Sequence, residues 1–130
     1  MSWLSQFVES ERKQKQQKLE VVFAGREPLD DRQLWERYFR QSDVAPETVA
    51  KIRWIFSTKL EADLSRIRDT DDFSKELAFF WDFDSLADVE LVQALEEQFG
   101  ITITDSEAEA MKTLRDIVLK VHAKIHKPTG

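Results

Sequence analysis

Apolar residues recur at helical spacing along most of the chain, and the alternation typical of strands is restricted to one short link. The clearest stripe lies in residues 46–60, which begin with Pro46, a residue that suits the first turn of a helix. Its apolar positions share one helix face and are Val49, Ile52, Ile55, Phe56 and Leu60. Because only three glycines and three prolines interrupt the 130 residues, the pattern predicts an all-α fold.

A second stripe follows the tripeptide Asp84-Ser85-Leu86. Its apolar positions are Leu86, Val89, Leu91, Val92, Leu95 and Phe99. Ser85 is a favoured residue for capping the first turn of a helix, and Gly100 suits the position just beyond a helix end. The pattern therefore predicts a helix over residues 86–99 with Ser85 as its N-cap.

The segment between these two stripes is predicted to be a long loop. Leu64 and Ile67 within residues 61–72 are spaced to reach a core, and residues 73–77 have the length of a single turn. Residues 78–83 (AFFWDF) are dense in aromatic side chains and come directly before the serine. We interpret them as an aromatic loop.

Two further helices are predicted after the second stripe. Asp105 is expected to cap a brief helix over residues 106–111, after an extended link. Thr113 and Asp116 have capping-box spacing at the start of a closing helix. The buried stripe expected for that helix consists of Leu114, Ile117, Val118, Val121 and Ile125.

Residues 1–45 are predicted to be a helical N-terminal extension, 46–126 a four-helix bundle, and 127–130 a disordered tail. The extension begins with a short apolar stripe made by Trp3, Leu4, Phe7 and Val8, and Asp30 and Gln33 have capping-box spacing at the start of a second short helix. The run that follows, 11–18, has no apolar residue, so it remains helical in solvent or frays. We expect the extension to dock on the main domain, with a membrane-surface helix as the less favoured alternative.

The composition excludes several kinds of site. The chain has no cysteine, which excludes disulfides, thiolate metal sites and cysteine catalysis and fits a reducing, cytoplasmic location. His122 and His126 share a helix face, but further ligands are lacking, so we expect no metal. No apolar run reaches the length of a membrane span, and the N-terminus does not resemble a secretory signal.

Charge is distributed unevenly over a chain whose net charge is −6. Residues 77–111 contain nine Asp and Glu and no Lys or Arg, whereas residues 1–68 contain thirteen Lys and Arg against eleven Asp and Glu. The acidic part repels nucleic acid and anionic membranes and attracts a basic protein surface. A plain solvated face is the alternative interpretation of this acidity.

Residues 84–92 (DSLADVELV) and 94–101 (ALEEQFGI) closely resemble the signature of acyl carrier proteins, and the register continues to Thr113-Leu114. The resemblance covers roughly residues 46–125. It implies a four-helix bundle with a long first loop and a short third helix. It also implies that Ser85 carries 4′-phosphopantetheine through a phosphodiester, and that acyl groups ride on the arm as thioesters. Ser85 as an N-cap alone is the alternative.

The resemblance implies that a phosphopantetheinyl transferase installs the arm and that enzymes of fatty acid or lipid biosynthesis handle the cargo. We expect the carrier to be a cytoplasmic monomer that performs no catalysis. In the family the acidic helix binds basic grooves on partner enzymes, and the candidate docking residues here are Asp84, Leu86, Asp88, Val89, Glu90, Gln93, Glu96 and Glu97. The side chains implied for an acyl pocket are Leu95, Ile103, Ala108, Met111, Ile117 and Val121; a plain core is the alternative for these.

Two features depart from the family pattern. The aromatic residues 78–83 replace a short link before the serine, and residues 1–45 are additional. Both favour a specialised carrier and keep a second hypothesis open, a carrier-fold interaction module without the arm. An enzyme is not expected, because the sequence has no Ser/His/Asp set, glycine-rich phosphate loop or metal constellation.

Overall fold

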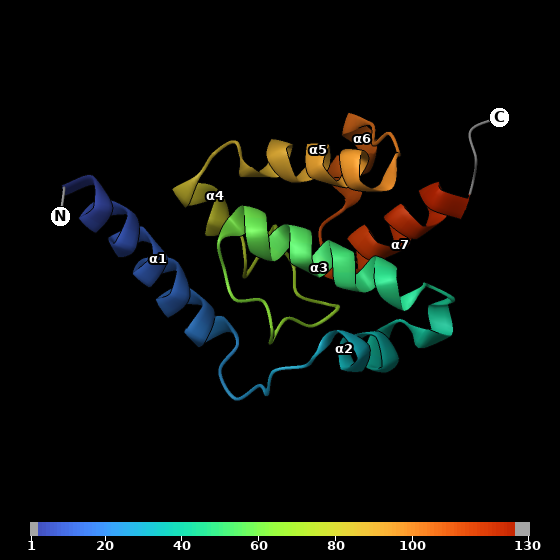
Figure 1. Cartoon of the computed structure of the whole chain (residues 1–130), viewed down its shortest axis with the longest axis horizontal. Coiled ribbons are helices and arrows are strands. Elements are labelled where there is room, and N and C mark those ends of the chain that lie inside the picture. The colour runs from blue at the N-terminus through green and yellow to red at the C-terminus, as the bar shows by residue number, and fades with distance from the viewer. Residues whose placement is uncertain (1–2, 127–130) are drawn as a thin grey trace.

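The computed structural model describes residues 3–126, which form seven α-helices and one 3-10 turn and no strand (Figure 1). The predicted all-α class is confirmed. The helices are α1 (Trp3–Val22), α2 (Asp31–Tyr38), α3 (Pro46–Leu60), α4 (Phe80–Phe83), α5 (Ala87–Phe99), α6 (Asp105–Ala110) and α7 (Leu114–His126), with the 3-10 turn η1 (Arg40–Ser42) after α2. The predicted tail, 127–130, lies outside the described residues.

Helix α3 is the central element of the bundle, with α2, α5 and α7 packed against it (Figure 1). Its bounds agree with the prediction, and its stripe is buried, with Ile52 fully inaccessible. Leu64 and Ile67 in the long loop are buried as expected, since their spacing lets both reach the core. Helices α3, α5, α6 and α7 are the four predicted helices of the bundle.

The N-terminal residues share the core of the bundle. Leu19, Phe23, Leu34 and Phe39 are all fully buried, and they belong to the same apolar cluster as Ile52. Burying side chains of this size contributes about 1.5–3 kcal/mol each. The additional residues therefore stabilise the whole molecule through the same core as the bundle.

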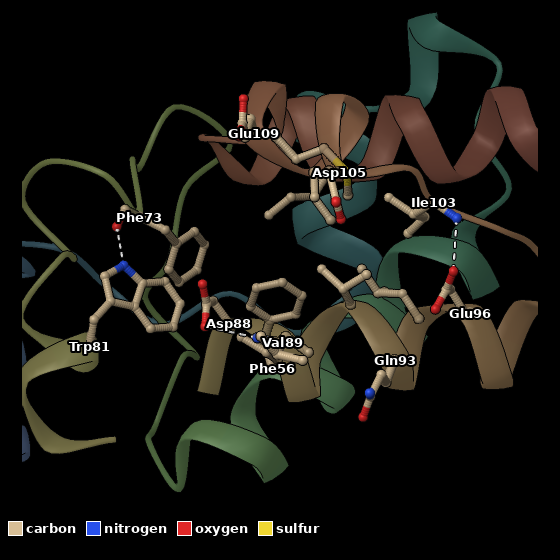
Figure 2. Close-up of a pocket in the computed structure, with 16 residues that line it drawn as sticks. Phe56, Phe73, Trp81, Asp88, Val89, Gln93, Glu96, Ile103, Asp105 and Glu109 are labelled. Atoms are coloured by element: carbon tan, nitrogen blue, oxygen red, sulfur yellow. Dashed lines mark hydrogen bonds between the residues drawn. The ribbon is translucent and has the colours of Figure 1, made fainter. Parts of the chain in front are cut away.

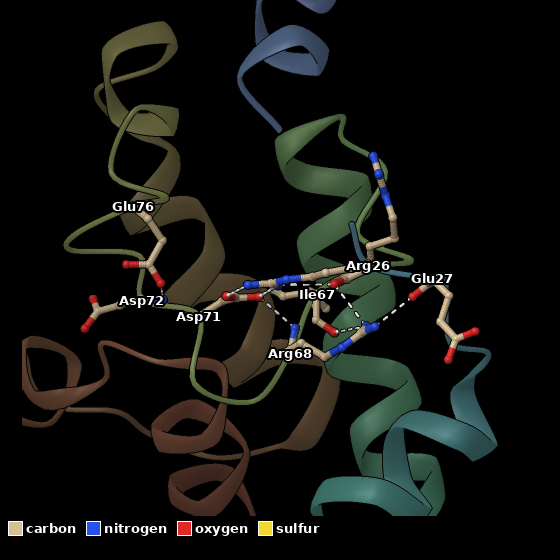
Figure 3. A network of polar contacts seen from close by, with 8 residues as sticks. Arg26, Glu27, Ile67, Arg68, Asp71, Asp72 and Glu76 are labelled. Atoms are coloured by element: carbon tan, nitrogen blue, oxygen red, sulfur yellow. Dashed lines mark hydrogen bonds and ion pairs between the residues drawn. The ribbon is translucent and has the colours of Figure 1, made fainter. Parts of the chain in front are cut away.

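A polar network ties the segment after α1 to the long loop (Figure 3). Arg26 contacts Asp71 through two nitrogen–oxygen pairs, Nη1 to Oδ2 at 2.7 Å and Nη2 to Oδ1 at 3.0 Å. The Arg68 backbone N–H also donates to Asp71 Oδ2, at 2.7 Å, and the Arg68 guanidinium donates to the Glu27 carbonyl oxygen, at 2.8 Å. The side chain of Asp71 is only 3% exposed, so Arg26 compensates a buried charge.

Helix α1 is longer than the sequence pattern indicated. Residues 11–18 are helical throughout, and Lys15 in their middle is 9% exposed, so this run is not wholly solvated. Its ammonium donates to the Leu60 carbonyl oxygen at 2.9 Å, at the C-terminal end of α3. The stripe that begins at Trp3 is instead exposed, because α1 extends beyond the body of the bundle at its N-terminal end (Figure 1).

Two predicted capping pairs are confirmed, and the predicted cap of α6 is wrong by one residue. Asp30 and Gln33 form the predicted capping box of α2, and Thr113 and Asp116 exchange hydrogen bonds at the start of α7. Helix α6 is capped by Thr104 and not by Asp105, because Thr104 Oγ1 accepts the Glu107 N–H and the Glu107 carboxylate accepts the Thr104 N–H. No helix in the described part is long and apolar enough to cross a membrane.

Candidate functional site

Ser85 lies in an exposed turn between α4 and α5. The prediction that it caps α5 is wrong, because the helix begins at Ala87 and its N-cap is Leu86. Asp84 shapes the turn instead: its Oδ1 accepts the Leu86 N–H at 3.0 Å and its carbonyl oxygen accepts the Ala87 N–H at 3.2 Å. Within residues 3–126, no polar contact engages the Ser85 hydroxyl, so this group is available for chemistry.

The aromatic residues before this turn form a helix, α4, and not the loop that the sequence indicated. Phe80 is 2% exposed and its ring lies 4.5 Å from that of Phe79. The Trp81 indole Nε1–H donates to the Phe73 carbonyl oxygen at 2.9 Å, which fixes the ring over the long loop. Because Phe80 is buried and Trp81 half-buried beneath the turn, the aromatic segment leaves Ser85 exposed.

A cavity of about 530 Å³ lies between α5 and α6 and begins beside the serine turn (Figure 2). Asp88 and Val89, in the first turn of α5, belong to its wall. Apolar side chains of other elements contribute to it, including Phe56 of α3 and Trp81 of α4, and Asp105 and Glu109 of α6 belong to its wall as well. Its size lies within the range of small-molecule sites, and its largely apolar lining suits an apolar ligand.

Five of the six side chains predicted for an acyl pocket line this cavity: Leu95, Ile103, Ala108, Met111 and Ile117. The sixth, Val121, is fully buried in the core and is not part of the lining. Phe56, Phe73 and Trp81 are lining residues that the sequence did not indicate. They come from segments far apart along the chain, which only the packing of the bundle brings together.

Seven of the eight residues predicted for docking are exposed around the start and outer face of α5: Asp84, Leu86, Asp88, Val89, Glu90, Gln93 and Glu97. Leu86 is 62% and Val89 50% exposed, so apolar contact area lies among the carboxylates. Glu96 differs, because it is only half-exposed and its carboxylate accepts the Ile103 N–H at 2.9 Å (Figure 2). It holds the link between α5 and α6.

Helix α6, the far wall of the cavity, is held to α7 by one carboxylate. Glu107 contacts Lys124 Nζ at 2.7 Å and Lys120 Nζ at 3.9 Å. The hydrogen bond from Lys124, together with the Thr104 backbone N–H, lowers the pKa of Glu107 from 4.5 to about 2. The carboxylate is therefore ionised over the whole physiological range.

A second cavity, of about 430 Å³, lies on the other side of the serine turn, between α1, α3 and α4. Asp84 and Ala87 line it, together with Phe80 and Phe83 of α4. Charged groups of α1 and of the α3 C-terminal end complete its wall: Glu11, Lys15, Lys59 and Glu61. This cavity could not be predicted from the sequence, because residues 11–18 contain no apolar side chain. Lys15 of this run nevertheless packs over Phe83, with 6.0 Å between the ammonium and the ring centroid.

Residues 50–121 match the family described as phosphopantetheine attachment site. The chain belongs to this family. The predicted resemblance is confirmed, and with it the expectation of 4′-phosphopantetheine as the prosthetic group. This phosphopantetheine-attachment domain is a non-catalytic carrier, and its helical fold carries an additional N-terminal helix.

Two relatives of the carrier support this assignment. The chain is 35% identical over 79 residues to an acyl carrier protein of Thermosynechococcus vestitus, a match that covers 61% of this chain and 93% of the relative. It is 36% identical over 77 residues to an acyl carrier protein of Helicobacter hepaticus, which covers 59% of this chain and 96% of the relative.

The residues present fit the prosthetic group. The Ser85 hydroxyl is exposed and unengaged, and a phosphodiester there lies near the positive end of the α5 dipole. The arm and its cargo would lie close to the first cavity, because two residues of its wall, Asp88 and Val89, follow Ser85 closely in the chain. When bound, the group supplies a terminal thiol that holds acyl groups as thioesters. Within residues 3–126, no cluster of His, Cys, Asp and Glu side chains could hold a metal ion.

Proposed function

We propose that the chain is a specialised acyl carrier that bears 4′-phosphopantetheine on Ser85 and moves thioester-linked acyl groups between partner enzymes. One observation carries the proposal: a serine whose hydroxyl is exposed and free of polar contacts stands in the D-S-L signature, directly before α5. The alternative, an interaction module without the arm, rests on the aromatic segment and the N-terminal extension. The aromatic segment does not favour it over a carrier, because Phe80 packs inward and Ser85 stays exposed.

The proposed docking surface is the start and outer face of α5, defined by the seven exposed residues Asp84, Leu86, Asp88, Val89, Glu90, Gln93 and Glu97. Five of the nine carboxylates of residues 77–111 lie on α5 or the turn before it, and a sixth lies on α4. Such a surface attracts basic grooves of a phosphopantetheinyl transferase and of acyl-handling enzymes, and it sets the association rate more than the affinity. A cytoplasmic location stays a prediction.

We assign the acyl chain to the cavity between α5 and α6. The support is its apolar lining, its volume of about 530 Å³ and its start beside the serine turn. Burial of a chain there removes apolar surface from water and keeps the thioester from hydrolysis while the carrier is between partners. Glu96 and Glu107 hold the α5–α6 link and α6 itself, so they keep the wall of the cavity in place.

The intact mass of the full chain tests the proposal after incubation with coenzyme A and a broad-specificity phosphopantetheinyl transferase. We expect the mass to rise by one phosphopantetheine group in the wild type and in Ser106→Ala, a matched change at another exposed serine. The mass of Ser85→Ala should stay constant. An unchanged wild-type mass, or modification of Ser85→Ala, contradicts the proposal.

A further inference from the structure

Ser85 stands at the boundary between two cavities. Asp84, the residue before it, and Ala87, two residues after it, line the second cavity, of about 430 Å³. The next two residues, Asp88 and Val89, line the first, which we have assigned to the acyl chain. A group attached to the serine therefore has two directions in which it can lie against the protein.

Helix α4 separates these cavities. Phe80 and Phe83, three residues apart and so on one helix face, line the second cavity, whereas Trp81 lines the first. The indole is fixed by its hydrogen bond to the Phe73 carbonyl oxygen (Figure 2). The aromatic segment that replaces a short link in this chain thus forms the partition between an apolar and a polar compartment.

The second cavity is lined by groups that complement a polar, amide-rich ligand. Lys15 is 9% exposed, and its ammonium donates to the Leu60 carbonyl oxygen and lies 3.9 Å from Glu61 Oε2. Lys59 makes no hydrogen bond or ion pair within residues 3–126, so its three N–H donors are free. Glu11 and Asp84 supply acceptors, and the Phe80 and Phe83 rings supply apolar surface between these polar groups.

We propose that this second cavity binds the pantetheine arm itself, between the serine and the thiol. The unpaired Lys59 ammonium faces the phosphodiester anion, and Lys15 donates to a carbonyl oxygen of the arm. The carboxylates accept the amide N–H groups, and the methyl groups of the arm pack on Phe83. The inference rests on the proposed function, because it requires the arm to be attached at Ser85.

Such a site is a property of this chain more than of its relatives. Glu11 and Lys15 belong to α1, a helix of 20 residues that precedes the family match at residues 50–121. The aligned segments make up 93% and 96% of the two relatives, which leaves them too few residues for a helix of this length. The extension therefore adds a wall beside the attachment serine, and with it a resting place for the arm.

The test uses the full chain loaded from coenzyme A with a 13C-labelled pantetheine portion, after intact mass has established loading. We expect isotope-filtered NOEs between the methyl protons of the arm and the ring protons of Phe80 and Phe83. Lys59→Met, at an exposed position that leaves the fold intact, should weaken these NOEs strongly, and Lys15→Met should do the same. Lys13→Met is the matched control, because Lys13 is exposed on the same helix.

The outcomes separate this inference from the function on which it rests. A chain that gains no mass overturns both. A chain that gains mass but shows NOEs only to residues of the first cavity, such as Val89 and Met111, overturns the second site and leaves the carrier function standing. An arm without NOEs to the protein, or NOEs that weaken equally in Lys13→Met, also overturns it. NOEs to Phe80 and Phe83 that depend on Lys59 support it.

Discussion

Asp71 shows how one side chain joins the additional residues to the bundle. Its carboxylate is 3% exposed and accepts hydrogen bonds from the Arg26 guanidinium and the Arg68 backbone N–H. The hydrogen bond and the charge of Asp71 raise the pKa of Arg26 above its ordinary value. A buried carboxylate is tolerated here because its partner arrives from a segment 45 residues earlier in the chain.

We predict that Arg26→Met lowers the free energy of unfolding by about 3 kcal/mol, because it leaves the Asp71 charge buried without a cation. This is the lower end of the range for a buried pair, since Arg26 itself is 28% exposed. Urea denaturation measures the loss. Arg32→Met breaks an exposed i,i+4 pair with Glu36 and should cost no more than about 0.5 kcal/mol.

The double variant Arg26→Met/Asp71→Asn supplies the decisive comparison. It should be more stable than Arg26→Met alone, because the neutral amide removes the uncompensated charge. If both Arg26→Met and Arg32→Met change stability equally, the buried pair does not hold the two segments together.

At the scale of elements, α6 depends on few contacts for its position. It has six residues, none of them buried. The Thr104–Glu107 capping box fixes its first turn, and the Glu107–Lys124 ion pair holds it to α7. The pKa of Glu107 is lowered from 4.5 to about 2 by these partners. Ionised Glu107 therefore stabilises the fold fully above pH 4.5, and this contribution is lost as pH falls through about 2.

We predict that Glu107→Gln lowers Tm at pH 6 and that the difference from wild type shrinks as pH falls from 4.5 toward 2. The wild type loses its ion pair in that window, whereas the glutamine variant has none to lose. Thermal unfolding followed by circular dichroism at pH 6, 4 and 3 measures the difference. Glu109→Gln, at an exposed position of the same helix, should shift Tm little at pH 6. A Tm difference that stays constant between pH 6 and pH 3 would show that ionisation of Glu107 does not stabilise the fold.

The sequence predicted the elements that have their own apolar stripe or cap. The bounds of α3 follow from Pro46 and its stripe, and Asp30 with Gln33 marks the start of α2. The prediction failed where two signals competed: beside Ser85, Asp84 shapes the turn and moves the helix start to Ala87. Cap preference could not place this start, because the observed N-cap, Leu86, makes no side-chain capping hydrogen bond.

The candidate site was also predictable only where its residues belong to a pattern that is visible in the sequence. Ser85 and five residues of the first cavity wall follow from a stretch whose register is visible in the sequence. The second cavity was not, because it depends on Lys15, a polar residue in a run without any apolar side chain. Its burial arises from tertiary packing of α1 against Leu60 and Phe83, which no local pattern encodes.

At the scale of the molecule, charge reversal on α5 should slow association with a basic partner. We predict that Glu90→Lys/Glu97→Lys reduces kcat/KM for loading by a phosphopantetheinyl transferase roughly tenfold at low salt. The effect should diminish at high salt, where exposed charges are screened. Initial rates at low and high ionic strength measure it.

Glu9→Lys is the matched control for this experiment, since it makes the same change on an exposed face of α1, outside the acidic segment. It should leave kcat/KM nearly unchanged. Glu96 is avoided as a target, because its carboxylate accepts the Ile103 N–H and its replacement disturbs the α5–α6 link. Equal losses in the Glu9 and α5 variants would exclude α5 as the docking surface.

The segregation of charge has a consequence for how partners meet. Nine carboxylates and no Lys or Arg lie within residues 77–111, on α4, α5, α6 and their links. The Lys and Arg of residues 1–68 lie on α1, α2, η1, α3, the segment after α1 and the loop after α3. Charges separated in this way give the molecule a permanent dipole moment. An approaching basic enzyme therefore exerts a torque as well as an attraction, and the carrier rotates so that α5 leads before the surfaces touch.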